Sequence, residues 1–259
     1  MGVKWVIGCF LWLGCIGQVV WADSDTLGYS DAVSTESSPS KAFNGADPYE
    51  AYNRAMFAFN DAFNQTVMTP VARAYTTVVP QPARTGVSNF IQNLGEPLNM
   101  ANALMQGNVE SGLTSLMRFS LNSTLGLAGL IDIGNAAGLS PQDEDFGQTL
   151  YVWGVWDQSN YLILPLLGPT TARGVMGMAV DTQYDPTYPH LLDWQTRQRL
   201  GLNVVKAVDT YVTVLPLLQE VQQQPDPYIF MRESFFQNRK NKLYNGQPPL
   251  PALDDFNFE

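Results

Sequence analysis

Few side chains in this sequence are of the types that perform covalent chemistry. The 259-residue chain has a single histidine, His190, and two cysteines, Cys9 and Cys15. The part after Cys15 therefore has no thiolate for a zinc site or for nucleophilic attack, and a Ser-His-Asp apparatus would have only one base. Asp193 follows His190 by three residues, but no serine lies near either in the sequence. We expect His190 to be structural or to lie at the surface, and we predict that the protein is not an enzyme.

The only dense acidic cluster is Asp143-Glu144-Asp145. Carboxylates are ligands that Ca²⁺ prefers, but the cluster lacks the ligand at every second position that a calcium loop requires. We favour a solvated turn that caps the next helix. The sequence also has no Gly-x-Ser-x-Gly elbow, phosphate-binding loop or dinucleotide fingerprint. No metal and no cofactor are therefore predicted.

The composition favours a surface that faces something other than water alone. Hydrophobic residues make up 45% of the chain and charged residues only 15%, against about 25% charged residues in typical soluble domains. The 24 acidic and 14 basic side chains give a formal net charge of −10. Because the basic residues are scattered singly, no patch for a phosphate backbone is predicted, and binding of nucleic acid is not expected.

Residues 1–22 have the pattern of a secretory signal peptide, with Lys4 before an apolar core and a cleavage site after Ala22. A lipoprotein signal, in which Cys15 becomes lipidated and begins the mature chain, is the alternative, and an uncleaved anchor is a third. In each case the body of the protein leaves the cytoplasm. Residues 23–46 have the composition of a flexible linker, and residues 244–259 that of a disordered acidic tail.

Residues 47–243 favour an all-α domain. Asp47 and Glu50 have the spacing of a capping box that would begin the first helix. Further helices are expected over residues 70–79, 83–92, 96–121, 174–180, 191–214 and 226–243, and no run alternates for long enough to predict a sheet. The first helix carries an apolar stripe that would face lipid or another helix, formed by Tyr52, Met56, Phe59 and Phe63.

Two apolar segments are interrupted by helix breakers. Residues 121–139 contain four glycines and Asp132. They favour either helices that approach closely as in a membrane, with Asp132 at a wet cavity, or a tightly packed core hairpin of a soluble helical protein. Residues 161–169 contain two prolines, which excludes a regular helix. After the signal no apolar run approaches ~18 residues, so a conventional transmembrane helix is not expected. Membrane contact would have to come from helices that lie in the interface.

Taken together, these segments resemble the MlaA (VacJ) family of outer-membrane lipid-asymmetry proteins over about residues 47–240. No single piece is specific, but their number and order are. The motifs that carry the resemblance are Asp47-Pro-x-Glu with Asn53-Arg54 and Phe59-Asn60, Pro70-Val-Ala-x-x-Tyr75 with Val79-Pro80, Ser88-Asn89-Phe90-x-x-Asn93-Leu94-x-Glu96-Pro97, Leu104-x-Gln106-Gly107, Arg118-Phe119-x-x-Asn122-Ser-Thr-Leu-Gly126-x-x-Gly129-x-x-Asp132, Glu144-Asp145-Phe146-Gly147-Gln148-Thr149-Leu150 with Trp153-Gly154, Leu164-Pro-x-x-Gly168-Pro169, and Asp226-Pro-Tyr-x-x-x-Arg232 with Gln237-x-Arg239.

The chain departs from the family pattern at two places. Ser159-Asn160-Tyr161 stands where the family usually has Gly-Pro-Tyr, so the turn there is expected to differ. Asp209-Thr-Tyr211 stands where an Asp-x-Arg is common, which puts a charged contact at that point in doubt.

The resemblance implies a ring of amphipathic, interfacial helices in the periplasmic leaflet of the outer membrane of a Gram-negative bacterium, around a central channel. Phospholipid that has strayed into the outer leaflet would enter the channel and pass to a soluble periplasmic lipid carrier, and so return toward the inner membrane. Association with a trimeric porin is also implied. A secreted phospholipase and a structural partner of porins are the two alternatives.

The candidate channel segment lies within Leu121–Leu150. Replacing Asp132 with Leu is expected to impair lipid removal without abolishing folding. The residues proposed for the headgroup side are Asn122, Asp132 and Gln148, and those for the tail side are Leu125, Leu127, Leu130, Ile131 and Phe146.

Overall fold

The computed structural model of the protein describes residues 47–185 and 196–249. The predicted signal peptide, the linker, Cys15, His190 and Asp193 lie outside the described residues. In chain order the elements are α2 (Glu50–Phe63), η2 (Asn64–Met68), α3 (Thr69–Val78), α4 (Gln81–Met105), α5 (Val109–Thr124), α6 (Ile133–Ala136), α7 (Phe146–Val152), β1 (Tyr161–Leu164), β2 (Gly168–Thr171), α8 (Ala172–Tyr184), α9 (Thr196–Gln222) and α10 (Pro227–Leu243).

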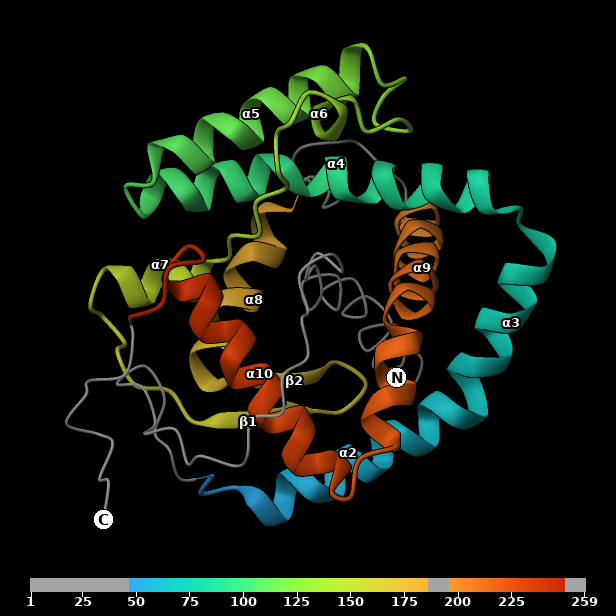
Figure 1. Ribbon diagram of the computed structural model, residues 1–259, viewed down its shortest axis with the longest axis vertical. Coiled ribbons are helices and arrows are strands. Elements are labelled where there is room, and N and C mark those ends of the chain that lie inside the picture. The colour runs from blue at the N-terminus through green and yellow to red at the C-terminus, as the bar shows by residue number, and fades with distance from the viewer. Residues whose placement is uncertain (1–46, 186–195, 250–259) are drawn as a thin grey trace, which may run out of the picture.

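The helices are arranged as a ring (Figure 1). The long pair α4 and α5 forms one side, α3 the next, and α2 the side opposite α4. The hairpin of β1 and β2 with α7, α8 and α10 closes the ring, and α9 contacts α3 and α4. The prediction of a mainly α-helical fold is confirmed.

The capping box expected at the start of α2 does not form. Helix α2 begins at Glu50, whose carboxylate pairs with Arg54 (2.7 Å) and does not reach back to Asp47. The Asp47 carboxylate accepts hydrogen bonds from the Asn53 side chain (2.9 Å) and from the Tyr228 hydroxyl. Asp47 therefore links the start of α2 to α10.

Helix α4 does not end where the sequence predicts. A break is expected between residues 92 and 96, but α4 continues through Pro97. The chain turns at Gly107 (φ +78°), a left-handed conformation that favours glycine, and Asn108 caps α5 by accepting a hydrogen bond from the Ser111 N–H (3.1 Å). Because α4 packs along α5, tertiary contacts outweigh the poor helix propensity of proline.

A short antiparallel hairpin corrects the expectation that the fold has no sheet. Strands β1 and β2 pair from Tyr161 opposite Thr171 to Leu164 opposite Gly168. The prediction that residues 161–169 are not a regular helix is confirmed. Each strand has only four residues, which is too short for an alternating pattern to stand out in the sequence.

Asn53 and Asn60, two turns apart on α2, pair with the outer edge of β1. Asn53 donates to the Tyr161 carbonyl (3.2 Å) and accepts from the Ile163 N–H (2.8 Å). Asn60 makes an equivalent pair of bonds at the end of the strand: it donates to the Leu164 carbonyl (2.9 Å) and accepts from the Leu166 N–H in the turn (2.7 Å). The free edge of the hairpin is therefore satisfied by side-chain amides, where a third strand would otherwise be needed.

The last helices agree in type with the prediction and differ in their ends. Asp226 caps α10 as expected, since its carboxylate accepts from two backbone N–H groups at 3.1 and 3.2 Å. The predicted tail begins too early, because the Tyr244 hydroxyl lies 2.9 Å from that of Tyr151 and the two rings pack edge to face. Residues 250–259 lie outside the described part of the chain.

Helix α9 differs from the prediction in its bounds and in how apolar it is. It runs past Pro216 to Gln222, and the expected start at residue 191 lies outside the described residues. Within the described part of the chain, the segment Leu200–Gln222 is long and apolar enough to cross a membrane, by length and composition alone, with a mean hydropathy of 1.2 over 18 residues, of which 28% are buried. This segment is not an uninterrupted apolar run in the sequence, because polar residues are scattered along the helix.

The interior of the ring wall is polar, and much of the exterior is apolar. Among the described residues, 21 polar or charged and nine apolar side chains are buried, whereas 24 large apolar side chains are exposed. Helix α5 has both faces: the buried one is Ser111, Ser115, Arg118 and Asn122, and the exposed one is Val109, Leu113, Leu116 and Met117. This is the reverse of a helix at the surface of a soluble protein.

Candidate functional site

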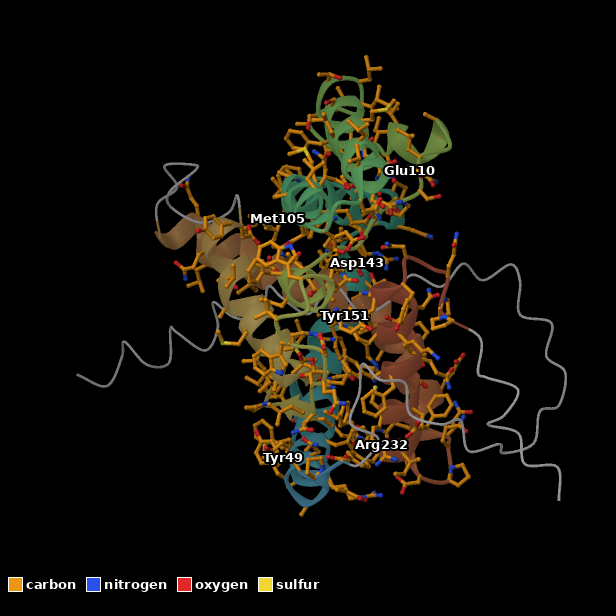
Figure 2. All side chains as sticks on the ribbon, turned by 90° about the vertical axis from the view of Figure 1, so that its left-hand side faces the viewer. Tyr49, Met105, Glu110, Asp143, Tyr151 and Arg232 are labelled. Carbon is orange, nitrogen blue, oxygen red and sulfur yellow. The ribbon has the colours of Figure 1, made fainter. Side chains whose placement is uncertain are left out.

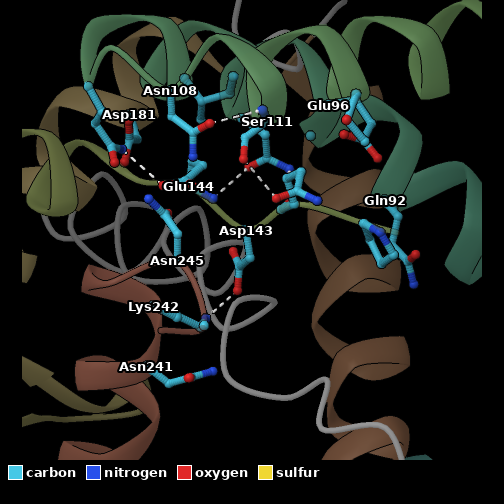
Figure 3. A pocket seen from close by; sticks show the side chains of 18 of the residues that line it. Gln92, Glu96, Asn108, Ser111, Asp143, Glu144, Asp181, Asn241, Lys242 and Asn245 are labelled. Carbon is cyan, nitrogen blue, oxygen red and sulfur yellow. Dashed lines mark hydrogen bonds and ion pairs between the residues drawn. The ribbon is translucent and has the colours of Figure 1, made fainter. Parts of the chain in front are cut away.

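The larger cavity of the protein, about 930 Å³, lies inside the ring. Residues of α4 and α5 form one wall, and the segment 141–144, α8 and the end of α10 form the others (Figure 3). Its volume is in the range of ligand-binding pockets. The polar side chains that line the cavity include Gln92, Glu96, Asn99, Gln106, Asn108, Glu110, Ser111, Thr114, Gln142, Asp143, Glu144, Asp181, Asp185, Lys206, Asn238, Asn241, Lys242, Asn245 and Gln247.

The acidic cluster at 143–145 forms part of this wall. Asp145 caps α7 as expected, by accepting a hydrogen bond from the Gln148 N–H (2.9 Å). The expectation of a solvated turn is wrong, since Glu144 and Asp145 are only 4% and 9% exposed. Two cations from α10 hold the cluster in place: Arg239 pairs with Asp145, and Lys242 with Asp143.

The surroundings shift the pKa values of Glu144, Asp145 and the nearby Asp181 in different directions. Burial raises the pKa of Asp145, but its pairing with Arg239 outweighs this and holds the pKa below the usual value. Burial raises the pKa of Glu144 to about 7, although a hydrogen bond from Gln106 (3.0 Å) opposes the shift. Burial also raises the pKa of Asp181 on α8 to about 6. The wall therefore contains carboxylates that titrate close to neutral pH.

Asp181 connects the walls of the cavity. It accepts a hydrogen bond from the Asn102 side chain of α4 (3.0 Å) and one from the Phe146 N–H (3.0 Å). The carbonyl oxygen of the Asn102 side chain accepts from the Thr149 hydroxyl (3.1 Å). This buried chain of bonds joins α4, α7 and α8, so the shape of the cavity depends on polar contacts.

A second polar network holds the hairpin that follows α5. Arg118 is 1% exposed and donates to Glu96 (2.6 Å), Asp132 (3.1 Å) and the Leu139 carbonyl (2.7 Å). The Asn122 side chain donates to Asp132 (3.0 Å). Burial raises the pKa of Asp132, but the Asn135 N–H and Arg118 together lower it below its usual value. The hairpin is therefore fixed to α4 and α5 by a buried ionic cluster.

The tip of the hairpin approaches α4 closely. Gly129 has a φ of +95°, and a Cβ atom there would lie 2.7 Å from the Asn93 side chain. Asn89 donates to the Leu130 carbonyl (3.1 Å). Glycine is required at residue 129 by both the conformation and the lack of space.

The eight predicted channel residues lie in two places. Asn122 and Asp132 belong to the network around Arg118, and the Gln148 side chain is buried and donates to the Asp143 carbonyl (2.8 Å). None of the eight is among the residues that line the larger cavity. Contact of any of them with lipid stays a prediction. The apolar members at the hairpin tip are about half or more exposed, namely Leu125, Leu127, Leu130 and Ile131, whereas Phe146 is half-buried against Trp153.

The predicted apolar stripe of α2 is divided between two environments. Tyr52 and Phe59 are 43% and 48% exposed, whereas Met56 and Phe63 are half-buried, and Met56 packs near Tyr161. The face that carries Asn53 and Asn60 points to the hairpin. Contact of the stripe with a membrane stays a prediction.

A second cavity of about 490 Å³ lies between α2, η2, the hairpin and α9. Its lining combines apolar side chains, such as Phe57, Ile163 and Leu215, with amide side chains, such as Asn60, Gln219 and Gln222. Tyr211, at the position where the family pattern has arginine, lines this cavity and its hydroxyl lies 2.9 Å from that of Thr69. In place of the charged contact there is thus a hydroxyl pair.

The second departure from the family pattern lies next to β1. The Ser159 hydroxyl accepts a hydrogen bond from the Arg173 N–H (2.8 Å), and Tyr161 is fully buried. Over residues 47–185 and 196–249, no three His, Cys, Asp or Glu side chains are placed to share a metal ion.

A ring of helices with a polar interior, an apolar exterior and a polar cavity defines a class of protein suited to contact with lipid. The chain belongs to the MlaA lipoprotein family, whose model matches residues 45–242. It is 36% identical over 225 residues to the "Intermembrane phospholipid transport system lipoprotein MlaA" of Escherichia coli (strain K12), covering 85% of this chain and 87% of the relative. The Haemophilus influenzae protein of the same name is 33% identical over 207 residues, covering 78% and 80%.

A solved structure has the same fold. It is described as "Structural basis for maintenance of bacterial outer membrane lipid asymmetry" and aligns with a TM-score of 0.65 and 35% identity, covering 78% of this chain and all of the other. The resemblance inferred from the motifs is therefore confirmed.

The sequence gives no direct indication of the larger cavity. Its lining comes from six separate stretches of the chain, and single polar residues such as Gln106 and Asp181 have no motif around them. One signal is present in retrospect: Gln92, Glu96 and Asn99, which line the cavity, recur at helical spacing on α4, and a polar stripe of this kind would face inward if the apolar face met lipid.

Proposed function

We propose that the protein is an outer-membrane component of a phospholipid transport system that maintains lipid asymmetry. In this proposal it takes up phospholipid mislocalised to the outer leaflet and passes it through the polar centre of the ring toward the periplasm. No bond is made or broken, so the protein acts as a conduit and not as an enzyme.

The observation that carries the proposal is the inverted polarity of the fold. Lipid tails cannot form hydrogen bonds, so a protein embedded among them must satisfy polar groups internally and expose apolar ones. A phospholipid headgroup, in turn, needs a polar route because its transfer into hydrocarbon is unfavourable. Helix α5 supplies both surfaces, since Ser111 of its buried polar face and the neighbouring Thr114 line the cavity and its apolar face is exposed.

The names of the relatives support the same conclusion. The E. coli and H. influenzae proteins are named for intermembrane phospholipid transport, and the solved structure for outer-membrane lipid asymmetry. We extend this to the finer features implied by the family: a position on the periplasmic side of the outer membrane, delivery to a soluble periplasmic lipid carrier, association with a trimeric porin, and export by a signal that either is cleaved after Ala22 or lipidates Cys15.

The hairpin after α5 has a distinct role in this proposal. Leu125, Leu127, Leu130 and Ile131 would contact lipid tails beside the ring, because they are exposed and lie within seven residues of one another. Asn122, Asp132 and Gln148 would act from behind, by fixing the hairpin and the acidic segment through their hydrogen bonds.

The proposal is tested by filling the cavity. Thr114 on α5 lines the cavity, whereas the adjacent Leu113 is 52% exposed on the opposite, apolar face. We expect Thr114→Trp to cause phospholipid to accumulate in the outer leaflet of a strain that depends on this protein, and Leu113→Trp to leave the leaflet unchanged. The measurement is surface phospholipid by selective labelling or by lipid A modification.

Normal outer-leaflet composition in a strain that lacks the protein entirely would contradict the transport role and favour a structural partner of porins. Release of fatty acid or lysolipid by the purified protein, lost in His190→Ala, would favour a phospholipase.

A further inference from the structure

The wall of the larger cavity carries an excess of negative charge. Its lining includes six carboxylates and two ammonium groups. Both lysines already have carboxylate partners: Lys242 pairs with Asp143, and Lys206 lies 3.7 Å from Asp185. The acidic members are Glu96, Glu110, Asp143, Glu144, Asp181 and Asp185.

The arginines behind the wall offset only a small part of this excess. Arg118 pairs with Glu96 of the wall but also with Asp132 behind it, and Arg239 pairs with Asp145. Each of these guanidinium groups is therefore matched by at least one carboxylate. Within the described part of the chain, the cavity presents no cation that lacks an acidic partner.

Three of the carboxylates are held out of water. Glu96, Glu144 and Asp181 are 2%, 4% and 8% exposed. The Oε2 atom of Glu96 is buried without a hydrogen-bond partner, although the same side chain lines the cavity. The Glu144 carboxylate accepts a hydrogen bond from the Gln106 side chain (3.0 Å). These carboxyl groups have unused acceptor capacity, and a cationic donor that enters the cavity would favour their ionised form.

The remaining lining is rich in amides. Figure 3 shows Gln92, Asn108, Asn241 and Asn245 around the acidic groups. Side-chain amides donate hydrogen bonds without adding positive charge. They can therefore donate to the oxygens of a phosphate diester while the carboxylates attract a cation. A wall with both features complements a headgroup that contains one negative and one positive group.

We propose that the cavity selects phospholipids whose headgroup bears a primary ammonium, such as phosphoethanolamine, over anionic ones such as phosphoglycerol. The inference rests on the proposed transport function and adds the class of lipid carried. The ammonium group donates to the carboxylates of Glu144 and Asp181, and the amides of α10 and α4 contact the phosphate. An anionic headgroup lacks the compensating cation and is repelled by the same wall.

The test uses the full-length protein in bilayer nanodiscs that contain equimolar dioleoyl-phosphatidylethanolamine and dioleoyl-phosphatidylglycerol. After extraction in mild detergent, the lipid retained by the protein is quantified by mass spectrometry. We expect at least about threefold enrichment of the ethanolamine lipid with the unmodified protein, because charge complementarity gives specificity of this order or more.

Two variants locate the selectivity in the cavity. Glu144→Gln removes a buried carboxylate, and Glu110→Lys reverses an exposed one that lines the cavity from the first turn of α5 (labelled in Figure 2). Both should lower the enrichment, and Glu110→Lys should bring it close to one. The matched control is Glu220→Lys, the same change at an exposed position of α9 that does not line the cavity.

The outcomes separate this inference from the transport function. Lipid retained in the proportions of the nanodisc, or an enrichment unchanged in both variants, overturns the selectivity alone. Loss of enrichment in Glu220→Lys as well would show that overall charge is responsible and would also overturn it. If the unmodified protein retains no lipid, both proposals fail together.

Discussion

Arg118 shows how a single residue supports the fold. Its guanidinium group is nearly inaccessible to water and donates to two carboxylates and one carbonyl. Removing one partner of a buried ion pair leaves an uncompensated charge, which costs about 3–5 kcal/mol. The family motif at 118–132 is thus explained by folding. For the same reason we now expect Asp132→Leu to lower stability in addition to any effect on lipid, because it also removes the cap of α6.

We predict that Arg118→Ala destabilises the protein by about 3–5 kcal/mol. Thermal unfolding in detergent, followed by circular dichroism, measures the change. Arg54→Ala is the control, because Arg54 forms an exposed pair with Glu50 and Asp226 and its loss should have a much smaller effect. Equal destabilisation by the two variants would contradict the importance of the buried cluster.

Glu144 gives the protein a pH dependence that can be isolated. Its pKa is about 7 in the fold against an ordinary value of 4.5. The folded state therefore binds a proton more tightly than the unfolded state, and the stabilisation is complete below about pH 4.5 and is lost as the pH rises toward 7. Relative to Glu144→Gln, the unmodified protein should lose about 1–3 kcal/mol between pH 5 and pH 8.

Unfolding midpoints of both proteins across this pH range provide the measurement. Glu220→Gln, at an exposed position of α9, should retain the pH profile of the unmodified protein. A constant difference between Glu144→Gln and the unmodified protein at all pH values would show that Glu144 does not titrate in this range.

At the scale of elements, α2 and the β-hairpin form a unit held by amide side chains. Asn53 and Asn60 replace the hydrogen bonds that a neighbouring strand would make. Each backbone group left unpaired in a buried position costs about 1–3 kcal/mol. The hairpin itself has only two strands of four residues, which are not stable alone.

We predict that Asn53→Leu increases amide hydrogen exchange at Ile163 and destabilises the protein by about 2–4 kcal/mol, since two buried backbone groups lose their partners. Mass spectrometry or NMR detects the exchange at the hairpin. Tyr52→Leu is the matched control, because Tyr52 precedes Asn53 on the exposed face of α2. Faster exchange in the control alone, or in neither, would contradict the pairing.

Sequence patterns anticipate the helices better than their ends or the orientation of their faces. The helical type of 70–79, 174–180 and 226–243 follows from periodicity and caps. The continuation of α4 through Pro97 and the hairpin at 161–171 depend on packing against distant residues, which local patterns do not contain. The inward direction of the α2 face that carries Asn53 becomes evident only from its hydrogen bonds to β1.

The whole molecule exposes an apolar outer surface that a signal or lipid anchor does not explain. Helix α5 contributes Leu113, Leu116 and Met117, which are 52%, 43% and 52% exposed. Exposed apolar area of this kind marks a site of contact with lipid or with another protein. The protein should therefore stay with the membrane even when its amino-terminal cysteine is changed.

We predict that a Cys15→Ala protein remains in the membrane fraction after a high-salt wash, and that the additional changes Leu113→Ser, Leu116→Ser and Met117→Ser reduce the bound fraction. Each buried CH₂ group contributes about 0.8 kcal/mol, so losing three large side chains weakens binding strongly. Fractionation with immunoblotting provides the measurement. Replacing Ser120, Thr85 and Gln65 with Ala, at exposed polar positions, should leave the fraction unchanged; release of Cys15→Ala alone would contradict the prediction.

The polar interior of the ring wall has a consequence for its thermodynamics. Unfolding normally raises the heat capacity by about 12–15 cal/mol/K per residue, chiefly because apolar side chains become hydrated. In this protein few apolar side chains are shielded by the fold itself, while many polar ones are. The heat capacity change of unfolding should accordingly be small in a lipid-like solvent. The free energy of unfolding should then change little with temperature, so the ring would be about as stable in the cold as in the warm.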